Sequence, residues 1–382
     1  MEQAAVKRLF LLAAGGTGGH MIPAHALAEE LIRRGHAVAL VTDARGARIP
    51  GLFAGVDVHV LPAGRLGGGV LGWIKAAKGI WQGRTAARGL IRDLEPVAVV
   101  GFGGYPALPT LLAALSLKLP TALQEQNAVL GRVNRLLARR VKVLATAYRQ
   151  VDRVPASVMP VVVGNPVRAE VLALRDQPYP PLTEDGIFRL LVTGGSQGAS
   201  ILSTVVPDAL GLLPIALRHR LQVTQQCRPE DIERVRARYA ELDIPADCAT
   251  YLGDLPERLG WSHLFVGRSG ASSIAELTAA GRPAILVPLP SAMDDHQTAN
   301  AREMAATGGA ASMPQGTFTP QRLAKQMQKM ALEPGALENA ATRARDAGYP
   351  HATRDLADLV VNLAGPTPSP IGPVPQFKEA FA

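Results

Sequence analysis

The feature that most constrains the fold is an apolar run followed by a glycine-rich turn and a helical pattern, which occurs twice. The first copy has an apolar run over 8–14, the turn Gly15–His20 and a helical pattern over 23–34. The second has an apolar run over 189–193 and the turn Gly194–Ala199. Buried strands that alternate with helices build a parallel sheet with helices on both faces. We therefore expect an α/β protein with two Rossmann-like domains.

The restart of this pattern near residue 164 sets the expected domain boundary. We predict an N-terminal domain over 1–164 and a C-terminal domain over 165–349, which suits a chain of 382 residues. A helix over about 350–364 is expected to pack back on the first domain, and the Pro-rich residues 365–382 are expected to be flexible. Two glycine turns in facing α/β domains predict a ligand cleft between them.

Composition narrows the classes of function. Cys227 and Cys248 are far from any CxxC spacing, which predicts two reduced thiols. The sequence shows no signal-peptide pattern and no apolar stretch of about eighteen residues, so we expect neither a leader nor a membrane-spanning helix. It also lacks zinc-finger spacing and RNA-binding aromatic motifs, which argues against a nucleic-acid partner.

The positive charge is concentrated in the first half of the chain. Residues 1–164 carry 20 Lys and Arg against 9 Asp and Glu, whereas residues 165–382 carry 20 against 23. Within the first half, the segment 66–90 alternates apolar and basic residues and contains no acid. Such a segment is typical of a helix at an anionic membrane surface, although a helix with its apolar side in the core is the alternative. The candidate membrane residues are Trp73, Ile74, Ile80 and Trp81, with Lys75, Lys78, Arg84 and Arg88.

Seven short motifs follow one another between residues 10 and 305. They are Gly15–His20, Gly101–Tyr105, Gln124–Asn127, Gly164–Arg168, Gly194–Ala199, Arg268–Ala271 with Glu276, and Asp295–Gln297 with Asn300–Ala301. In this order they resemble the MurG family of bacterial glycosyltransferases. The resemblance implies the GT-B fold, in which two Rossmann-like domains face each other across a cleft.

The same resemblance implies a reaction. The family transfers GlcNAc from UDP-GlcNAc to the C4 hydroxyl of MurNAc in undecaprenyl-pyrophosphoryl-MurNAc-pentapeptide, with inversion, which converts lipid I to lipid II in peptidoglycan synthesis. The expected location is the cytoplasmic side of the inner membrane, as a peripheral protein. The resemblance leaves open an association with other cell-wall and division proteins.

Residue roles on the donor side follow from the matching motifs. A carboxylate such as Glu276 accepts hydrogen bonds from two ribose hydroxyls, and Arg168 suits a phosphate. Helix N-termini and backbone N–H groups can hold the diphosphate, and the sequence has no Asp-x-Asp motif, so no metal or other cofactor is expected. The residues implied to bind UDP-GlcNAc are Thr17, Gly18, Gly19, Asn127, Arg168, Ser196, Leu252, Ala271, Ser272, Ser273, Ile274, Ala275, Glu276 and Gln297.

The acceptor side has two candidates for the general base. His20, at the end of the first glycine turn, has a side chain whose usual pKa of about 6.5 suits proton transfer. Glu125 is the competitor, and the sequence leaves the choice open. Gly16 and Tyr105 are expected to line the acceptor side, together with Thr17. The first glycine turn is therefore expected to meet the acceptor pyrophosphate and the reacting sugar.

Two other functions are compatible with the sequence. A UDP-GlcNAc 2-epimerase would share the fold and the donor but would leave the basic segment 66–90 unexplained. The intact polar residues argue against a non-catalytic UDP-sugar-binding scaffold of the division machinery; they are Asn127, Ser196, Glu276 and Gln297. Acceptor-dependent release of UDP distinguishes the transferase from both.

Overall fold

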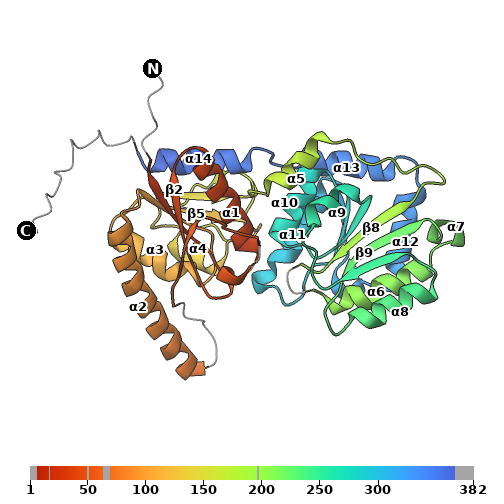
Figure 1. Ribbon diagram of the computed structural model, residues 1–382, viewed down its shortest axis with the longest axis horizontal. Coiled ribbons are helices and arrows are strands. Elements are labelled where there is room, and N and C mark those ends of the chain that lie inside the picture. Colours follow the sequence, from red (N-terminus) through yellow and green to blue (C-terminus); the bar gives the residue numbers. More distant parts are fainter. Residues whose placement is uncertain (1–6, 17, 50, 63–68, 196–197, 366–382) are drawn as a thin grey trace, which may run out of the picture.

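Two parallel β-sheets, each covered by helices on both faces, lie side by side in the computed structural model (Figure 1). The structure describes residues 7–16, 18–49, 51–62, 69–195 and 198–365, with the side chains of 69–76 left out. This arrangement confirms the predicted fold class of two Rossmann-like domains.

The first sheet has the strand order β3-β2-β1-β4-β5-β6-β7 in the described part of the chain, and every pair is parallel. At its centre Leu11 of β1 pairs with Ala39 of β2 and Val99 of β4. The strands are β1 Leu9–Ala13, β2 Ala37–Thr42, β3 Asp57–Val60, β4 Ala98–Gly101, β5 Thr121–Glu125, β6 Val143–Thr146 and β7 Val161–Val162.

Alternate residues of β1 supply the cores on the two faces of this sheet, because successive side chains of a strand point to opposite faces. Phe10 and Leu12 pack in one cluster with α1, and Leu11 and Ala13 pack in the other with α2, α3 and α4. The helical elements of this domain are α1 Gly18–Arg33, η1 Gly46–Arg48, α2 Gly69–Leu94, α3 Ala107–Ser116 and α4 Arg132–Leu137.

The second sheet has the order β10-β9-β8-β11-β12-β13 and is also parallel throughout the described residues. Its strands are β8 Phe188–Thr193, β9 Leu221–Gln226, β10 Ala246–Ala249, β11 Leu264–Gly267, β12 Ala284–Leu286 and β13 Ala310–Ser312. Its helical elements are α5 Ala169–Ala173, η2 Leu174–Asp176, α6 Ser200–Gly211, α7 Ile215–Arg218, α8 Ile232–Glu241, α9 Leu255–Trp261, α10 Ala271–Ala280, η3 Met293–Asp295, α11 His296–Ala306, η4 Gln315–Thr317, α12 Pro320–Leu332 and α13 Ala336–Asp346.

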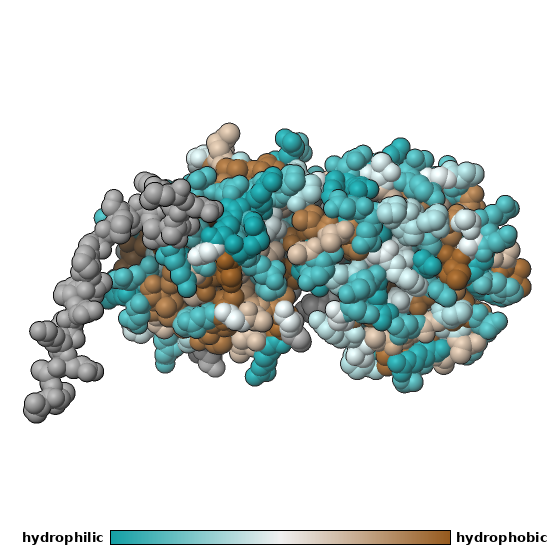
Figure 2. Space-filling model, turned by 45° about the horizontal axis from the view of Figure 1, so that its top comes forward, coloured by the Kyte–Doolittle hydropathy of each residue, from teal (hydrophilic) through white to brown (hydrophobic). Residues whose placement is uncertain are grey.

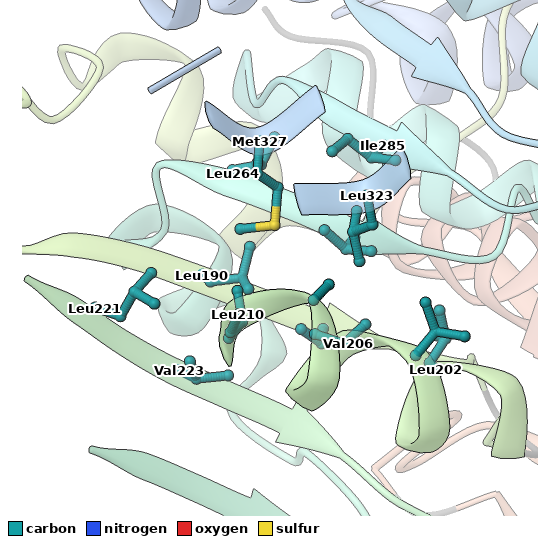
Figure 3. Packing of buried hydrophobic residues seen from close by; sticks show 14 of the residues in the cluster. Leu190, Leu202, Val206, Leu210, Leu221, Val223, Leu264, Ile285, Leu323 and Met327 are labelled. Atoms are coloured by element: carbon teal, nitrogen blue, oxygen red, sulfur yellow. The ribbon is translucent and has the colours of Figure 1, made fainter. Parts of the chain in front are cut away.

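Close apolar packing fixes the helices on this second sheet. Figure 3 shows Leu202 and Val206 of α6 and Met327 of α12 packed over strand residues such as Leu190 and Leu264. All five of these residues are 0% exposed. A core of this density holds β8 and α6 in a fixed place relative to α10 on the opposite face.

The last helix returns to the first domain. Helix α14, Ala352–Leu363, packs against α1, and Leu356, Ala357 and Val360 are buried in the core of the first domain (Figure 1). Asp358 accepts a hydrogen bond from Arg34 Nη1 at 2.5 Å. The observed helix lies within the predicted range 350–364. In the described residues, no helix combines the length and the apolar character that crossing a bilayer requires.

Candidate active site

A cleft of about 1780 Å³ lies between the two domains, and both glycine turns line it. The two domains form separate lobes with a constriction between them (Figure 2). The lining loops follow β1, β4 and β5 in one domain and β8 and β11 in the other, so the cleft lies at the carboxyl ends of the strands. The cleft predicted from the two facing glycine turns is therefore present.

Most of the predicted site residues meet in this cleft. Ile274 and Ala275 are not among its lining residues, because they lie on the side of α10 that packs on the domain, and Thr17 and Ser196 lie outside the described residues. The predicted residues that line the cleft are Gly16, Gly18, Gly19, His20, Tyr105, Glu125, Asn127, Arg168, Leu252, Ala271, Ser272, Ser273, Glu276 and Gln297.

An aspartate that the sequence analysis did not assign holds the first glycine turn. Asp43, which follows β2, accepts hydrogen bonds from the N–H groups of Gly16 and Gly46, each at 3.0 Å. Burial acts to raise the pKa of Asp43, but these two N–H groups and Arg45 outweigh it, so the pKa lies below its usual range. Asp43 is thus a stable anion that fixes the turn beside His20.

His20 projects into the cleft from the start of α1. Its ring is half-buried, and the Nδ1 atom lies 3.0 Å from Oε1 of Gln126. The ring lies against Gly104, which has a φ of +76°, and a Cβ added there would lie 3.3 Å from His20 Cδ2. Burial lowers the pKa of His20 below 6.5, although Glu125 and Gln126 act in the opposite direction. His20 is therefore neutral at pH 7, as a general base must be.

Glu125, the other candidate base, is saturated with hydrogen-bond donors. Its Oε1 accepts from the backbone N–H and the side-chain amide of Asn127, at 3.0 and 3.1 Å. Its Oε2 accepts from the N–H of Gly131 at 2.8 Å and from Asn134 Nδ2 at 2.9 Å. A carboxylate has about four lone-pair sites, so these donors occupy them all. The four hydrogen bonds hold the loop after β5 and leave the Glu125 carboxylate no free lone pair for a proton.

Asn300 joins the two domains beside this loop. Its Oδ1 accepts from the N–H of Ala128 at 2.8 Å, and its Nδ2 donates to Asn127 Oδ1 at 3.0 Å and to the carbonyl of Ser269 at 3.2 Å. Asn300 is fully buried. One side chain from α11 therefore fixes the loop after β5 relative to the loop after β11.

A second interdomain contact is an ion-pair cluster around Asp294. This carboxylate lies 2.7 Å from Arg153 Nη1, 3.5 Å from Arg132 Nε and 3.6 Å from Arg135 Nη2. Asp294 has a φ of 55°, a conformation that is uncommon for residues other than glycine. No local motif marks this residue, because its partners lie more than 140 positions earlier in the chain.

On the donor side, Arg168 and Glu276 form an ion pair. Both Nε and Nη2 of Arg168 contact Oε1 of Glu276, at 2.9 and 2.8 Å. Burial raises the pKa of Glu276, and Arg168 acts to lower it. The structure therefore places Arg168 on the carboxylate, whereas the sequence analysis expected it at a phosphate. Both contacts are to Oε1, so Arg168 does not occupy Oε2 of Glu276.

The N-terminus of α10 also faces the cleft. Ala271, Ser272 and Ser273 form its first turn, and free N–H groups and the helix dipole at such a terminus favour an anion. Gln297 is held nearby, because its Oε1 accepts from the N–H of Leu289 at 3.0 Å. Among the described residues, no cluster of three or more His, Cys, Asp or Glu side chains is arranged to hold a metal ion.

The candidate membrane segment forms part of α2. Trp81 is 66% exposed and Lys78 is exposed, whereas Ile80 is half-buried against the core that α2 shares with α3. Arg84 and Arg88 are half-buried. The side chains of Trp73, Ile74 and Lys75 lie outside the described residues.

Comparisons with known proteins assign the family. Residues 10–146 match the glycosyltransferase family 28 N-terminal domain, and residues 189–360 match the glycosyltransferase family 28 C-terminal domain. Two relatives are named UDP-N-acetylglucosamine–N-acetylmuramyl-(pentapeptide) pyrophosphoryl-undecaprenol N-acetylglucosamine transferase. The one from Zymomonas mobilis is 65% identical over 94% of this chain and 94% of its own length. The one from Novosphingobium aromaticivorans is 63% identical over 93% and 92%.

Solved structures agree with this assignment. The crystal structure of Acinetobacter baumannii MurG has a TM-score of 0.72 at 30% identity and covers 93% of this chain and 99% of its own. The UDP-GlcNAc 2-epimerase of Neisseria meningitidis has a TM-score of 0.62 at 14% identity, covering 93% and 100%, and so shares the fold alone. The chain therefore belongs to the MurG family, with both domains of glycosyltransferase family 28.

Proposed function

We propose that the chain transfers GlcNAc from UDP-GlcNAc to the C4 hydroxyl of MurNAc in undecaprenyl-pyrophosphoryl-MurNAc-pentapeptide, which makes lipid II from lipid I. The observation that carries this proposal is the cleft that sets neutral His20 of one domain opposite the N-terminus of α10 and Glu276 of the other. The relatives from Z. mobilis and N. aromaticivorans, which match along nearly their whole length, carry the name of this reaction. The reaction places the protein in cell-wall biogenesis, and hence in cell shape and division.

The C-terminal domain would bind the donor. Glu276 Oε2 accepts hydrogen bonds from the ribose hydroxyls, with its other oxygen held by Arg168. The N–H groups at the start of α10 then stabilise the charge that develops on the leaving UDP. These backbone groups can do this work without a metal ion or another cofactor.

The N-terminal domain would activate the acceptor. As the C4 oxygen attacks the anomeric carbon, its proton passes to the imidazole of His20, and the bond from the anomeric carbon to the diphosphate oxygen breaks. Attack from the face opposite the leaving group inverts the configuration. The basic N-terminal domain and the first glycine turn suit the pyrophosphate of the acceptor.

Acceptor dependence tests this function. We expect the purified chain to release UDP from labelled UDP-GlcNAc only when lipid-linked MurNAc-pentapeptide is present, and at the same rate with a metal chelator. Formation of ManNAc without an acceptor would indicate a 2-epimerase instead, and binding of UDP-GlcNAc with no turnover in either condition would indicate a scaffold. Loss of the rate in the chelator would overturn the metal-independent step.

We also infer that the protein associates peripherally with the anionic cytoplasmic surface of the inner membrane. Exposed Trp81 and Lys78 on α2 and the excess of basic residues over 1–164 support this inference. The acceptor is a polyprenyl lipid, so its sugar reaches the cleft only near a bilayer. Other cell-wall and division proteins are further partners to test once the membrane contact is defined.

Charge reversal in α2 is expected to weaken membrane binding. Changing Lys75, Lys78, Arg84 and Arg88 to glutamate should lower partitioning onto anionic vesicles by at least about 10-fold, since each cation contributes about 1 kcal/mol near the surface. Sedimentation with vesicles measures the fraction of each variant that is bound. The matched control reverses four exposed cations of the other domain, Arg322, Lys325, Lys329 and Arg343. Equal partitioning of the two variants would contradict the inference.

A further inference from the structure

A chain of buried side-chain amides runs from His20 to the linker between the domains. Oε1 of Gln126 lies 3.0 Å from His20 Nδ1, Nε2 of Gln126 lies 2.5 Å from Gln124 Oε1, and Nε2 of Gln124 lies 3.3 Å from Asn165 Oδ1. Gln124 and Gln126 are at most 1% exposed, and Asn165 is 7% exposed. The reaction proposed above assigns no role to these amides.

Backbone carbonyls determine which end of the Gln126 amide donates and which end accepts in this series of hydrogen bonds. Nε2 of Gln126 lies 2.8 Å from the carbonyl oxygen of Phe102 and 3.2 Å from that of Gln124. A carbonyl oxygen can only accept, so the amide group facing both must be the NH₂. The other end of Gln126, which faces His20, is therefore an oxygen and can only accept.

This polarity determines the tautomer of His20. An atom that hydrogen-bonds to an oxygen acceptor must carry the proton, so Nδ1 of His20 is protonated. Burial keeps the ring neutral, and the lone pair then lies on Nε2. The Cδ2–Nε2 edge of the ring lies against Gly104, which lines the cleft, since a Cβ at Gly104 would be 3.3 Å from Cδ2 and 3.5 Å from Nε2.

We propose that Gln126 is a positioning residue that holds the proton of His20 on Nδ1 and directs the free lone pair of Nε2 into the cleft. Gln126 in turn donates to Gln124, and Gln124 donates to Asn165, so each hydrogen bond in this series polarises the next. Asn165 lies between β7 and α5, where the chain crosses from the first domain to the second, so this series of hydrogen bonds connects the base to the crossing segment. The kinetic part of the proposal depends on the proposed glycosyl transfer, whereas the tautomer does not.

Two titratable groups also face His20 and could affect its protonation. Glu125 lies at the end of β5 and acts to raise the pKa of His20, while His296 approaches from α11 and acts to lower it. Neither makes a hydrogen bond to the His20 ring among the described residues, so neither selects which nitrogen carries the proton. Gln126 differs from Glu125 and His296 because it selects which nitrogen of His20 carries the proton.

The tautomer can be measured in the wild-type chain without any substrate. We expect ¹⁵N NMR of histidine-labelled full-length protein at pH 7.5 to show a neutral His20 ring with a protonated Nδ1 and an unprotonated Nε2. A His20→Gln variant assigns the signals. A neutral ring protonated on Nε2 would overturn the proposal whether or not the chain has transferase activity.

Variants of Gln126 test its effect on the reaction. Gln126→Met should lose the Nδ1–H signature and lower kcat by about 10-fold to 100-fold, with little change in KM for UDP-GlcNAc. Gln126→Glu keeps an acceptor for Nδ1–H, so it should retain the tautomer and move the acidic limb of the pH–kcat profile to higher pH.

The matched control is Gln225→Met. Gln225 is an equally buried glutamine that accepts a hydrogen bond from Tyr239 at 2.5 Å, but it does not line the cleft. It should cost stability without changing the His20 spectrum or the pH profile. Retention of the Nδ1–H signature and of kcat within twofold in Gln126→Met would overturn the proposal. If Gln126→Met does not fold, the wild-type spectrum and Gln126→Glu still decide it.

Discussion

Replacing His20 with alanine is expected to lower kcat for GlcNAc transfer by about 10²-fold to 10⁴-fold, the range that one general base contributes. The KM for UDP-GlcNAc should change little, because Glu276, Arg168 and the start of α10 belong to the other domain. Steady-state release of UDP with a lipid-linked acceptor measures both constants. The control is His219→Ala, which removes an exposed imidazole outside the cleft and should leave both constants unchanged.

The pH dependence of kcat is an independent test of His20 as the base. Burial places the pKa of His20 below its ordinary value of 6.5, and only the neutral ring accepts a proton. The rate should therefore keep its plateau to a lower pH than an ordinary imidazole would allow, and fall as the pH drops through the lowered pKa. The residual rate of His20→Ala should lack this acidic limb. A His20→Ala variant with an unchanged kcat and the same acidic limb would show that another group is the base.

The fold could be predicted from the sequence because its main signals are local. Apolar runs such as 8–14 and 189–193, each before a glycine turn, identify central strands of both sheets. Short edge strands carry no such signal. The two-residue strand β7 and the three-residue strand β13 exist because the neighbouring strands β6 and β12 offer them hydrogen-bonding groups, and those strands are not adjacent to them in the sequence.

The cleft could be predicted only in outline, for the same physical reason. Motifs next to each other in the chain identified His20, Glu125, Arg168 and Glu276 as polar residues of the site. Their roles depend on partners that the fold brings from elsewhere. Arg168 lies 108 positions from Glu276 in the sequence, so their ion pair was not foreseeable from either motif. Asp294 and its three arginines were missed for the same reason.

The role of Glu125 also depends on partners that its motif does not show. We expect its removal to have a large effect on stability. In the sequence it is an acid within Gln124–Asn127, which is equally suited to a base or to a structural role. In the structure it is 1% exposed and accepts four hydrogen bonds from Asn127, Gly131 and Asn134. Replacement by alanine leaves four donors without their acceptor, and each buried unsatisfied group costs about 1–3 kcal/mol.

Glu125→Ala is therefore expected to lower the free energy of unfolding by at least about 3 kcal/mol. Urea denaturation followed by circular dichroism measures this, and Glu233→Ala, which removes an exposed carboxylate on α8, should cost less than about 0.5 kcal/mol. If Glu125 were the catalytic base instead, its replacement would affect kcat and not stability. Glu125→Gln would then keep its stability and lose kcat, because the amide preserves the shape and cannot accept the proton. If the carboxylate instead holds the loop, Glu125→Gln turns an NH₂ group toward two donors, so stability falls and Asn127 loses its place beside Asn300.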